Sequence, residues 1–118
     1  MGLDMYSLTT ATDISAADFP EPEDHARLFY WRKHPNLHGW FEALYRRKGG
    51  EEEFNCVTLR LDAADLDALE QAVRSDSLPY TEGFFFGHSD GSERADDEHF
   101  IHLARDALAK GLRVYYIS

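Results

Sequence analysis

The chain has 118 residues, of which 43% are hydrophobic and 14% aromatic, and its formal net charge is −10. This length fits one domain with a core of its own, and the sequence has no run of about 18 apolar residues that would span a bilayer. A single cysteine, Cys56, excludes an internal disulfide and a thiolate zinc cluster. The acidic balance opposes nonspecific binding to nucleic acid or anionic lipid, so we expect neither a nucleic acid nor a membrane as a partner.

Positive charge is concentrated in one segment of the chain. Residues 1–24 contain no lysine or arginine, whereas Glu42 is the sole acid of residues 25–48. The first residues also lack the basic and apolar regions of a secretory signal peptide, which predicts a cytoplasmic protein.

The first part of the chain is predicted to be extended. Residues 5–11 are rich in β-branched and aromatic residues in partial alternation, which predicts a strand. Residues 12–24 carry Asp, Ser and prolines without a period and predict a loop. Residues 27–31 fit either a strand or the first turn of a helix, and we favour the strand.

The first helix is well marked in the sequence. Pro35 suits the first helical turn, where its missing N–H costs no hydrogen bond. Glycines at 49 and 50 supply a left-handed cap at its end. Between them, apolar residues at helical spacing form one stripe: Leu37, Trp40, Phe41, Leu44 and Tyr45.

Alternating apolar residues over 57–61 predict the next strand, and a second helix follows it to about Ser75. Asp62 is placed to cap that helix and Asp65 to complete a capping box. Residues 83–87, three phenylalanines between two glycines, predict an interior strand. Residues 88–96 predict a polar loop.

Asp96 is placed to cap a last helix that ends at Lys110-Gly111, and residues 112–118 predict a final strand. The element order predicts an α+β fold in a single domain, residues 1–118, with two or three layers. We expect a mixed sheet of four or five strands packed with three helices. Strands separated by helices near the end predict consecutive right-handed crossover units.

Rings and cations gather at one strand-to-helix corner, which we name the Trp31–Trp40 corner: Trp31, Arg32, Lys33, His38 and Trp40. Arginine beside aromatic rings is a usual way to hold phosphates, and Trp and Arg are typical interface anchors. The corner is therefore a candidate site for a small anionic ligand or a partner protein. The structural alternative is that the aromatic rings belong to the core and the basic side chains form a solvated rim around them.

A few patterns point instead to an enzyme. Residues 87–91 match G-x-S-x-G formally, but the helix that should follow the serine directly begins several residues late. Histidine spacing allows a metal site at His38 and His99 with Asp97. The rival interpretation is thus a small hydrolase or metal-dependent enzyme using His38, His88 and His99 with a nearby acid.

Several pieces of the sequence stand in the order found in one protein family. They are MGLDMY at the start, YWRK at 30–33 before His38, Trp40 and Phe41, LP before GFFFG at 78–87, and the terminal Tyr115-Tyr116. The chain resembles this family of small uncharacterised phage and bacterial proteins. It departs from the family at His34-Pro35, where relatives read Ala-Asn, and at His88-Ser89, where relatives read Ser-Thr. These departures weaken the G-x-S-x-G reading and any metal site on His34 or His88.

The resemblance implies a phage or prophage connection and carries over no activity and no catalytic residue. We therefore expect a non-enzymatic accessory domain, without a cofactor, that binds a protein or a small anionic ligand at the Trp31–Trp40 corner. A homodimer built on exposed aromatic area is a further possibility.

Overall fold

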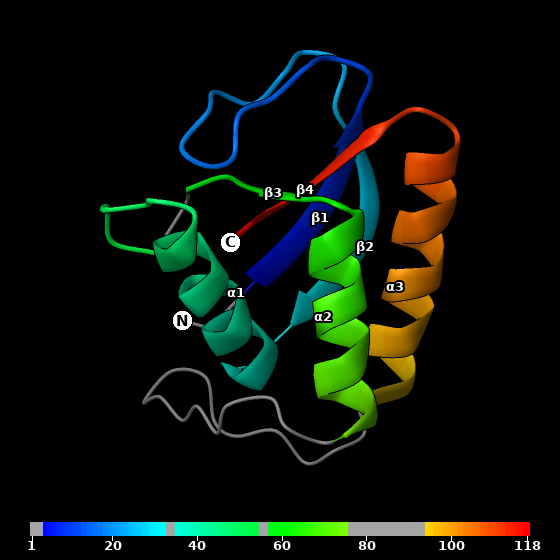
Figure 1. Ribbon diagram of the computed structural model, residues 1–118. Helices are drawn as coiled ribbons and strands as arrows, with labels where there is room; N and C mark the ends of the chain where they lie inside the picture. The colour runs from blue at the N-terminus through cyan, green and yellow to red at the C-terminus, as the bar shows by residue number, and fades with distance from the viewer. Residues whose placement is uncertain (1–3, 33–34, 55–56, 76–93) are drawn as a thin grey trace.

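The computed structural model describes residues 4–32, 35–54, 57–75 and 94–118, without the side chains of Arg32, Pro35, Asn36 and Arg94. These residues form an α+β domain (Figure 1), which confirms the predicted fold class. Its elements in chain order are β1 (Asp4–Thr10), β2 (Ala26–Arg32), α1 (Pro35–Arg47), β3 (Leu59–Leu61), α2 (Ala63–Arg74), α3 (Arg94–Ala109) and β4 (Arg113–Ile117).

The strands form one sheet in the order β2-β1-β4-β3, and every neighbouring pair is antiparallel. The expected crossover units were wrong, because consecutive right-handed crossovers would leave β3 and β4 parallel. A helical pattern between two predicted strands shows that a helix connects them, but it does not show whether the second strand runs parallel or antiparallel to the first. The described sheet is therefore antiparallel and not mixed, and the strand predicted at 83–87 lies outside the described residues.

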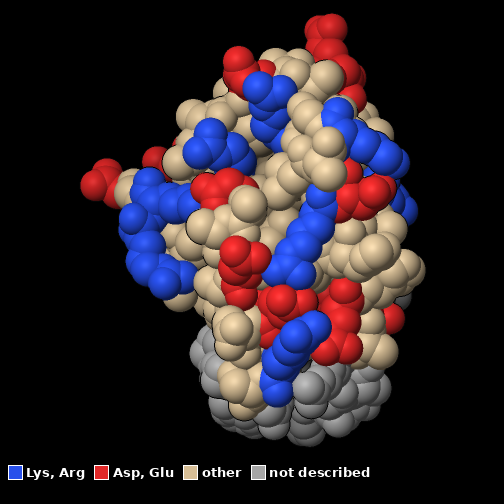
Figure 2. All heavy atoms as spheres, turned by 45° about the vertical axis from the view of Figure 1, so that its right-hand side comes forward, with Lys and Arg blue, Asp and Glu red and all other residues tan. Residues whose placement is uncertain are grey.

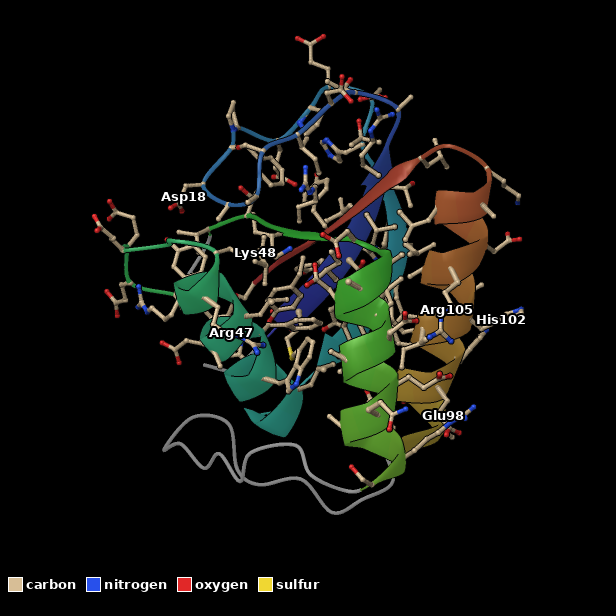
Figure 3. All side chains as sticks on the ribbon, in the orientation of Figure 1. Asp18, Arg47, Lys48, Glu98, His102 and Arg105 are labelled. Carbon is tan, nitrogen blue, oxygen red and sulfur yellow. The ribbon has the colours of Figure 1, made fainter. Side chains whose placement is uncertain are left out.

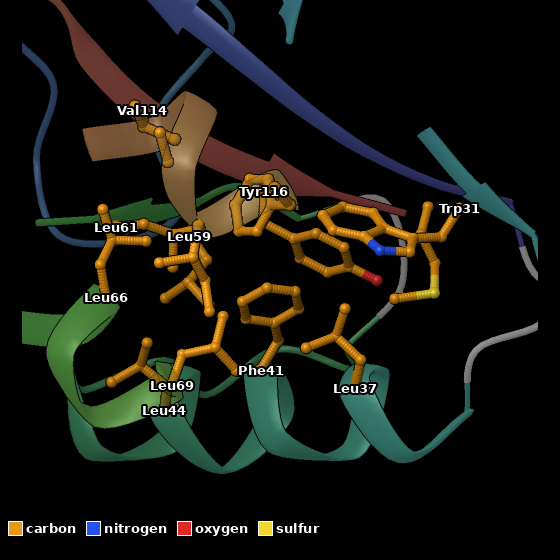
Figure 4. Packing of buried hydrophobic residues seen from close by; sticks show 14 of the residues in the cluster. Trp31, Leu37, Phe41, Leu44, Leu59, Leu61, Leu66, Leu69, Val114 and Tyr116 are labelled. Carbon is orange, nitrogen blue, oxygen red and sulfur yellow. The ribbon is translucent and has the colours of Figure 1, made fainter. Parts of the chain in front are cut away.

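The three helices lie over one face of the sheet, and the main core is between them (Figures 1 and 4). The predicted stripe of α1 packs there, with Leu37, Phe41 and Leu44 facing Tyr116 of β4. The ring of Phe41 stacks on that of Tyr116 with centroids 4.2 Å apart. Each such buried side chain contributes about 1.5–3 kcal/mol through removal of apolar area from water.

The opposite face of the sheet is covered in part by the loop over residues 11–25, which joins β1 to β2. Ile14 and Phe19 of this loop pack on Leu8 and Tyr115 in a second, smaller buried cluster. The carboxylate of Asp24 fastens the loop by accepting hydrogen bonds from Thr10, from the Ala11 backbone N–H at 2.8 Å and from Thr12. The loop predicted over 12–24 is thus confirmed, and it forms a second layer on part of this face.

Helix ends follow the sequence signals closely. Asp62 and Asp65 form the predicted capping box of α2, with each side chain accepting from the other's backbone N–H. Gly49 and Gly111 adopt φ of +95° and +85°, as left-handed residues after α1 and α3. Helix α3 begins at Arg94, two residues before the expected cap, so Asp96 lies in its first turn. A carboxylate there complements the positive end of the helix dipole.

Charged side chains of both signs interleave over α2 and α3 (Figure 2). Arg105 of α3, labelled in Figure 3, donates to Glu70 at 2.9 Å and to Asp67 at 2.8 Å on α2. This ion-pair network ties the two helices together on their outer side. No helix in the described part of the chain has the length and apolar character needed to cross a membrane.

Candidate functional site

Trp31, the first residue of the Trp31–Trp40 corner, lies in the core. It sits on β2 with 4% of its surface exposed, and its ring contacts those of Phe29, Phe41 and Phe100. Among the described residues its indole N–H has no hydrogen-bond acceptor. A ring held on these sides by other rings packs the helices on the sheet and offers a ligand little surface.

His38 is also buried, on the inner side of α1. Its Nδ1 atom shares a hydrogen bond of 2.7 Å with the hydroxyl of Tyr116, and its ring lies 4.8 Å from that of Phe54. Burial lowers the pKa of His38 to about 4 and raises the pKa of Tyr116 well above its ordinary value. Both groups are therefore neutral near pH 7, in a polar pair enclosed by rings.

The remaining corner residues do not complete an open site in the described part. Trp40 is half-buried on α1 and packs edge-on against Phe41 at 5.6 Å. Lys33 and the side chain of Arg32 lie outside the described residues. Trp31 and His38 are linked through the stacked rings of Phe41 and Tyr116, so the structure joins these residues through the core.

The candidate metal residues are spread over the fold. Asp97 is 1% exposed in the first turn of α3, while the exposed His99 packs edge-on against Phe29 of β2. His38 belongs to α1 and is hydrogen-bonded to Tyr116. Within the ranges the structure describes, no three His, Cys, Asp or Glu side chains come together to hold a metal ion. His88 and the G-x-S-x-G segment lie outside those ranges.

A different constellation lies on the sheet face away from the helices, and a β-bulge creates it. The register between β1 and β2 shifts between Ser7 and Leu8, so that Ser7 pairs with Phe29 and Leu8 with Arg27. Leu28 is the extra residue, and both Leu28 and Phe29 pack on the helix-side core. The bulge therefore aims Arg27 to the same side as Tyr30, which a regular strand would not do.

The guanidinium of Arg27 consequently lies over two tyrosine rings. Its Cζ atom is 5.2 Å from the ring centroid of Tyr6 and 5.7 Å from that of Tyr30. Tyr30 is 39% exposed, and its hydroxyl donates to Asp4 at 2.7 Å. Such cation–π contacts are worth about 0.5–1 kcal/mol at exposed sites. We name Tyr6, Arg27 and Tyr30 the tyrosine–arginine platform.

The platform borders a hollow of about 450 Å³. Its lining combines the apolar side chains of Leu8 and Ile117 with the polar residues Glu21, His25 and Ser118. The Glu21 carboxylate accepts a hydrogen bond of 2.8 Å from the Tyr115 hydroxyl, whose pKa is raised by burial and by this carboxylate. Glu21 is thus hydrogen-bonded to the sheet through Tyr115. Arg27 forms no ion pair or side-chain hydrogen bond with the described residues.

Trp31 of the predicted corner and Tyr30 of the platform are neighbours on β2, and their side chains face opposite sides of the sheet. Alternation along the strand sends Trp31 to the core and Tyr30 to the open face. That alternation is readable in the sequence once the strand is accepted. The bulge at Leu28 has no such signal, and without it Arg27 is assigned to the wrong face.

No family model, no curated protein and no solved structure matches this chain. The resemblance to phage and bacterial proteins therefore rests on the sequence motifs alone and stays a prediction. Any functional conclusion has to come from the chemistry of the described surface.

Proposed function

We propose that this protein is a non-enzymatic binding domain that holds an anionic group of its ligand or partner at the tyrosine–arginine platform. The observation that carries the proposal is the exposed guanidinium of Arg27, supported by two rings and left without a carboxylate among the described residues. A guanidinium presents a planar fork of donors that matches a carboxylate or a phosphate.

The surroundings favour an anion attached to an apolar body. Tyr6 and Ile117 line the hollow beside Arg27, and apolar walls with few polar groups are typical of ligand sites. The platform is exposed where Trp31 and His38 are buried, which supports it over the Trp31–Trp40 corner as the binding surface.

Titration with phenyl phosphate and with inorganic phosphate, followed by NMR, tests this function. We expect phenyl phosphate to shift the signals of Tyr6, Arg27 and Tyr30 and to bind more tightly than inorganic phosphate, because its ring can contact the apolar side chains that line the hollow. Arg27→Gln should weaken phenyl phosphate binding by about tenfold or more, since a charge-assisted hydrogen bond is lost.

Arg113→Gln is the matched control, because Arg113 stands on β4 and is already ion-paired with Asp13. It should leave the affinity for phenyl phosphate unchanged. Equal losses in the two variants, or shifts spread evenly over the surface, would mean that no specific anion site exists at the platform.

A further inference from the structure

The two edges of the described sheet differ in what covers them. At β3, a strand of three residues, the loop between β1 and β2 pairs with the outer side. The Asp18 backbone N–H donates to the Thr58 carbonyl, and the Arg60 backbone N–H donates to the Ala16 carbonyl, each at 3.0 Å. Ala17 and Leu59 form a bridge between these bonds. This edge is therefore closed by the chain itself.

The other edge is formed by β2, which pairs with β1 and ends the strand order. It is seven residues long and reads ARLFYWR, with aromatic and aliphatic residues between two arginines. Proteins usually protect an edge of this kind by shortening it, by placing proline, charged side chains or a β-bulge on it, or by covering it. Strand β2 is longer than β3 and contains no proline or lysine, and its bulge at Leu28 leaves Phe29 to Arg32 in regular register with β1. Arg27 and Tyr30 are exposed on the platform side.

We propose that β2 receives an extended acidic peptide from a partner protein, which adds a strand to the sheet and places a carboxylate on Arg27. The inference rests on the proposed function and specifies its partner. An added strand gains affinity from main-chain hydrogen bonds, and its alternate side chains supply specificity. Every second side chain of the peptide faces the platform side, so an acid at alternate positions reaches Arg27.

Charge selects the peptide. Between Ala26 and Arg32 the strand has two arginines and no acid, although the whole chain carries a net charge of −10. An acidic strand is therefore attracted to β2 and repelled by most of the remaining surface, which confines it to this edge.

The same charges disfavour a second copy of this chain at β2. Two copies of β2 side by side would bring Arg27 and Arg32 of both copies into one two-stranded ribbon. Like charges on neighbouring strands destabilise the pairing, and two bodies with net charges of −10 repel each other as well.

A capped peptide alternating glutamate and valine over about eight residues, the length of a typical strand, is the direct probe. Two matched peptides accompany it, one N-methylated on every backbone nitrogen and one with lysine for each glutamate. Affinity is measured by NMR titration, and hydrogen exchange of the β2 amides is measured with and without peptide.

We expect the glutamate peptide to bind and to slow exchange of β2 amides, while β3 amides keep their rates. The N-methylated peptide keeps its charge but loses its main-chain donors, so its affinity should fall by about tenfold or more. The lysine peptide should not bind. Arg27→Gln should weaken the glutamate peptide by about tenfold and Arg113→Gln should leave it unchanged.

Other outcomes overturn the inference in distinguishable ways. If phenyl phosphate binds at the platform but N-methylation leaves peptide affinity unchanged, the anion site stands and strand addition is wrong. If slower exchange at β2 depends on protein concentration and not on peptide, the occupant is a second copy. If neither phenyl phosphate nor the peptide binds, the proposed function itself fails.

Discussion

The two faces of the sheet use adjacent, similar residues for different purposes. On β4, Tyr116 points to the helices, where its hydroxyl bonds His38 and its ring stacks on Phe41. Tyr115 points to the other face, where its hydroxyl donates to Glu21 of the covering loop. Three helices enclose the first face, whereas a loop covers only part of the second and leaves the tyrosine–arginine platform exposed. The helix face holds the main core, and the open face carries the binding surface that we propose.

Removing a ring from each face tests this division most strongly. Phe41→Ala should lower the free energy of unfolding by about 3–5 kcal/mol, because it opens a cavity beneath Tyr116 in the enclosed core. Tyr30→Ala, on the open face, should cost about 1 kcal/mol or less. Denaturant unfolding of both variants measures the difference. Equal costs would mean that the open face also carries the stability of the domain.

The buried histidine gives the helix face a pH dependence. The pKa of His38 is about 4 in the folded protein, against 6.5 when the side chain is free in water. As the pH falls, His38 is protonated in the unfolded chain before it is protonated in the folded protein. The contribution of His38 to the free energy of unfolding is therefore fully present above pH 6.5 and is lost as the pH drops to about 4. The loss from this one residue is at most about 3 kcal/mol.

His38→Gln offers a matched control, because the amide keeps a polar partner for the Tyr116 hydroxyl without titrating. Denaturant unfolding of both proteins at a series of pH values should show a flatter dependence in the variant between pH 4 and 6.5. If the variant loses as much stability as the parent between pH 6.5 and 4, that loss comes from carboxylates and not from His38.

The smallest effect is expected at the platform itself. Arg27→Gln should lower the free energy of unfolding by about 0.5–1 kcal/mol, because the exposed guanidinium bonds no described side chain and the variant loses only its cation–π contacts with Tyr6 and Tyr30. Thermal melting of this variant beside Arg113→Gln provides the measurement. A large drop in melting temperature for Arg27→Gln alone would make Arg27 a structural residue and remove the contrast between the faces.

Much of the fold follows from periodicity and caps in the sequence. The apolar stripe of α1, the capping box at Asp62 and the glycine that ends each of two helices predict elements close to those observed. The direction of the strands could not be predicted in this way, because the sequences of β3 and β4 fit a parallel and an antiparallel pair equally well. Their pairing is decided by contacts between residues far apart in the chain.

The candidate site was less predictable for a related reason. Trp31 and His38 were chosen for chemical type, and the packing of rings around them decides that they are buried. Arg27 owes its position to a single extra residue, Leu28, in the register with β1. A bulge is set by the fit of one strand to its neighbour, which no local pattern in β2 reveals.

The short pairing between residues 16–18 and β3 has a consequence for assembly. A sheet with one edge already paired can add a strand at its other edge, but it has no second free edge at which a further molecule could pair. Growth by edge-to-edge stacking, the route to fibres, needs two receptive margins on each unit. Because residues 16–18 already pair with β3, a strand added at β2, as we propose, would not be extended into a fibre through the β3 edge.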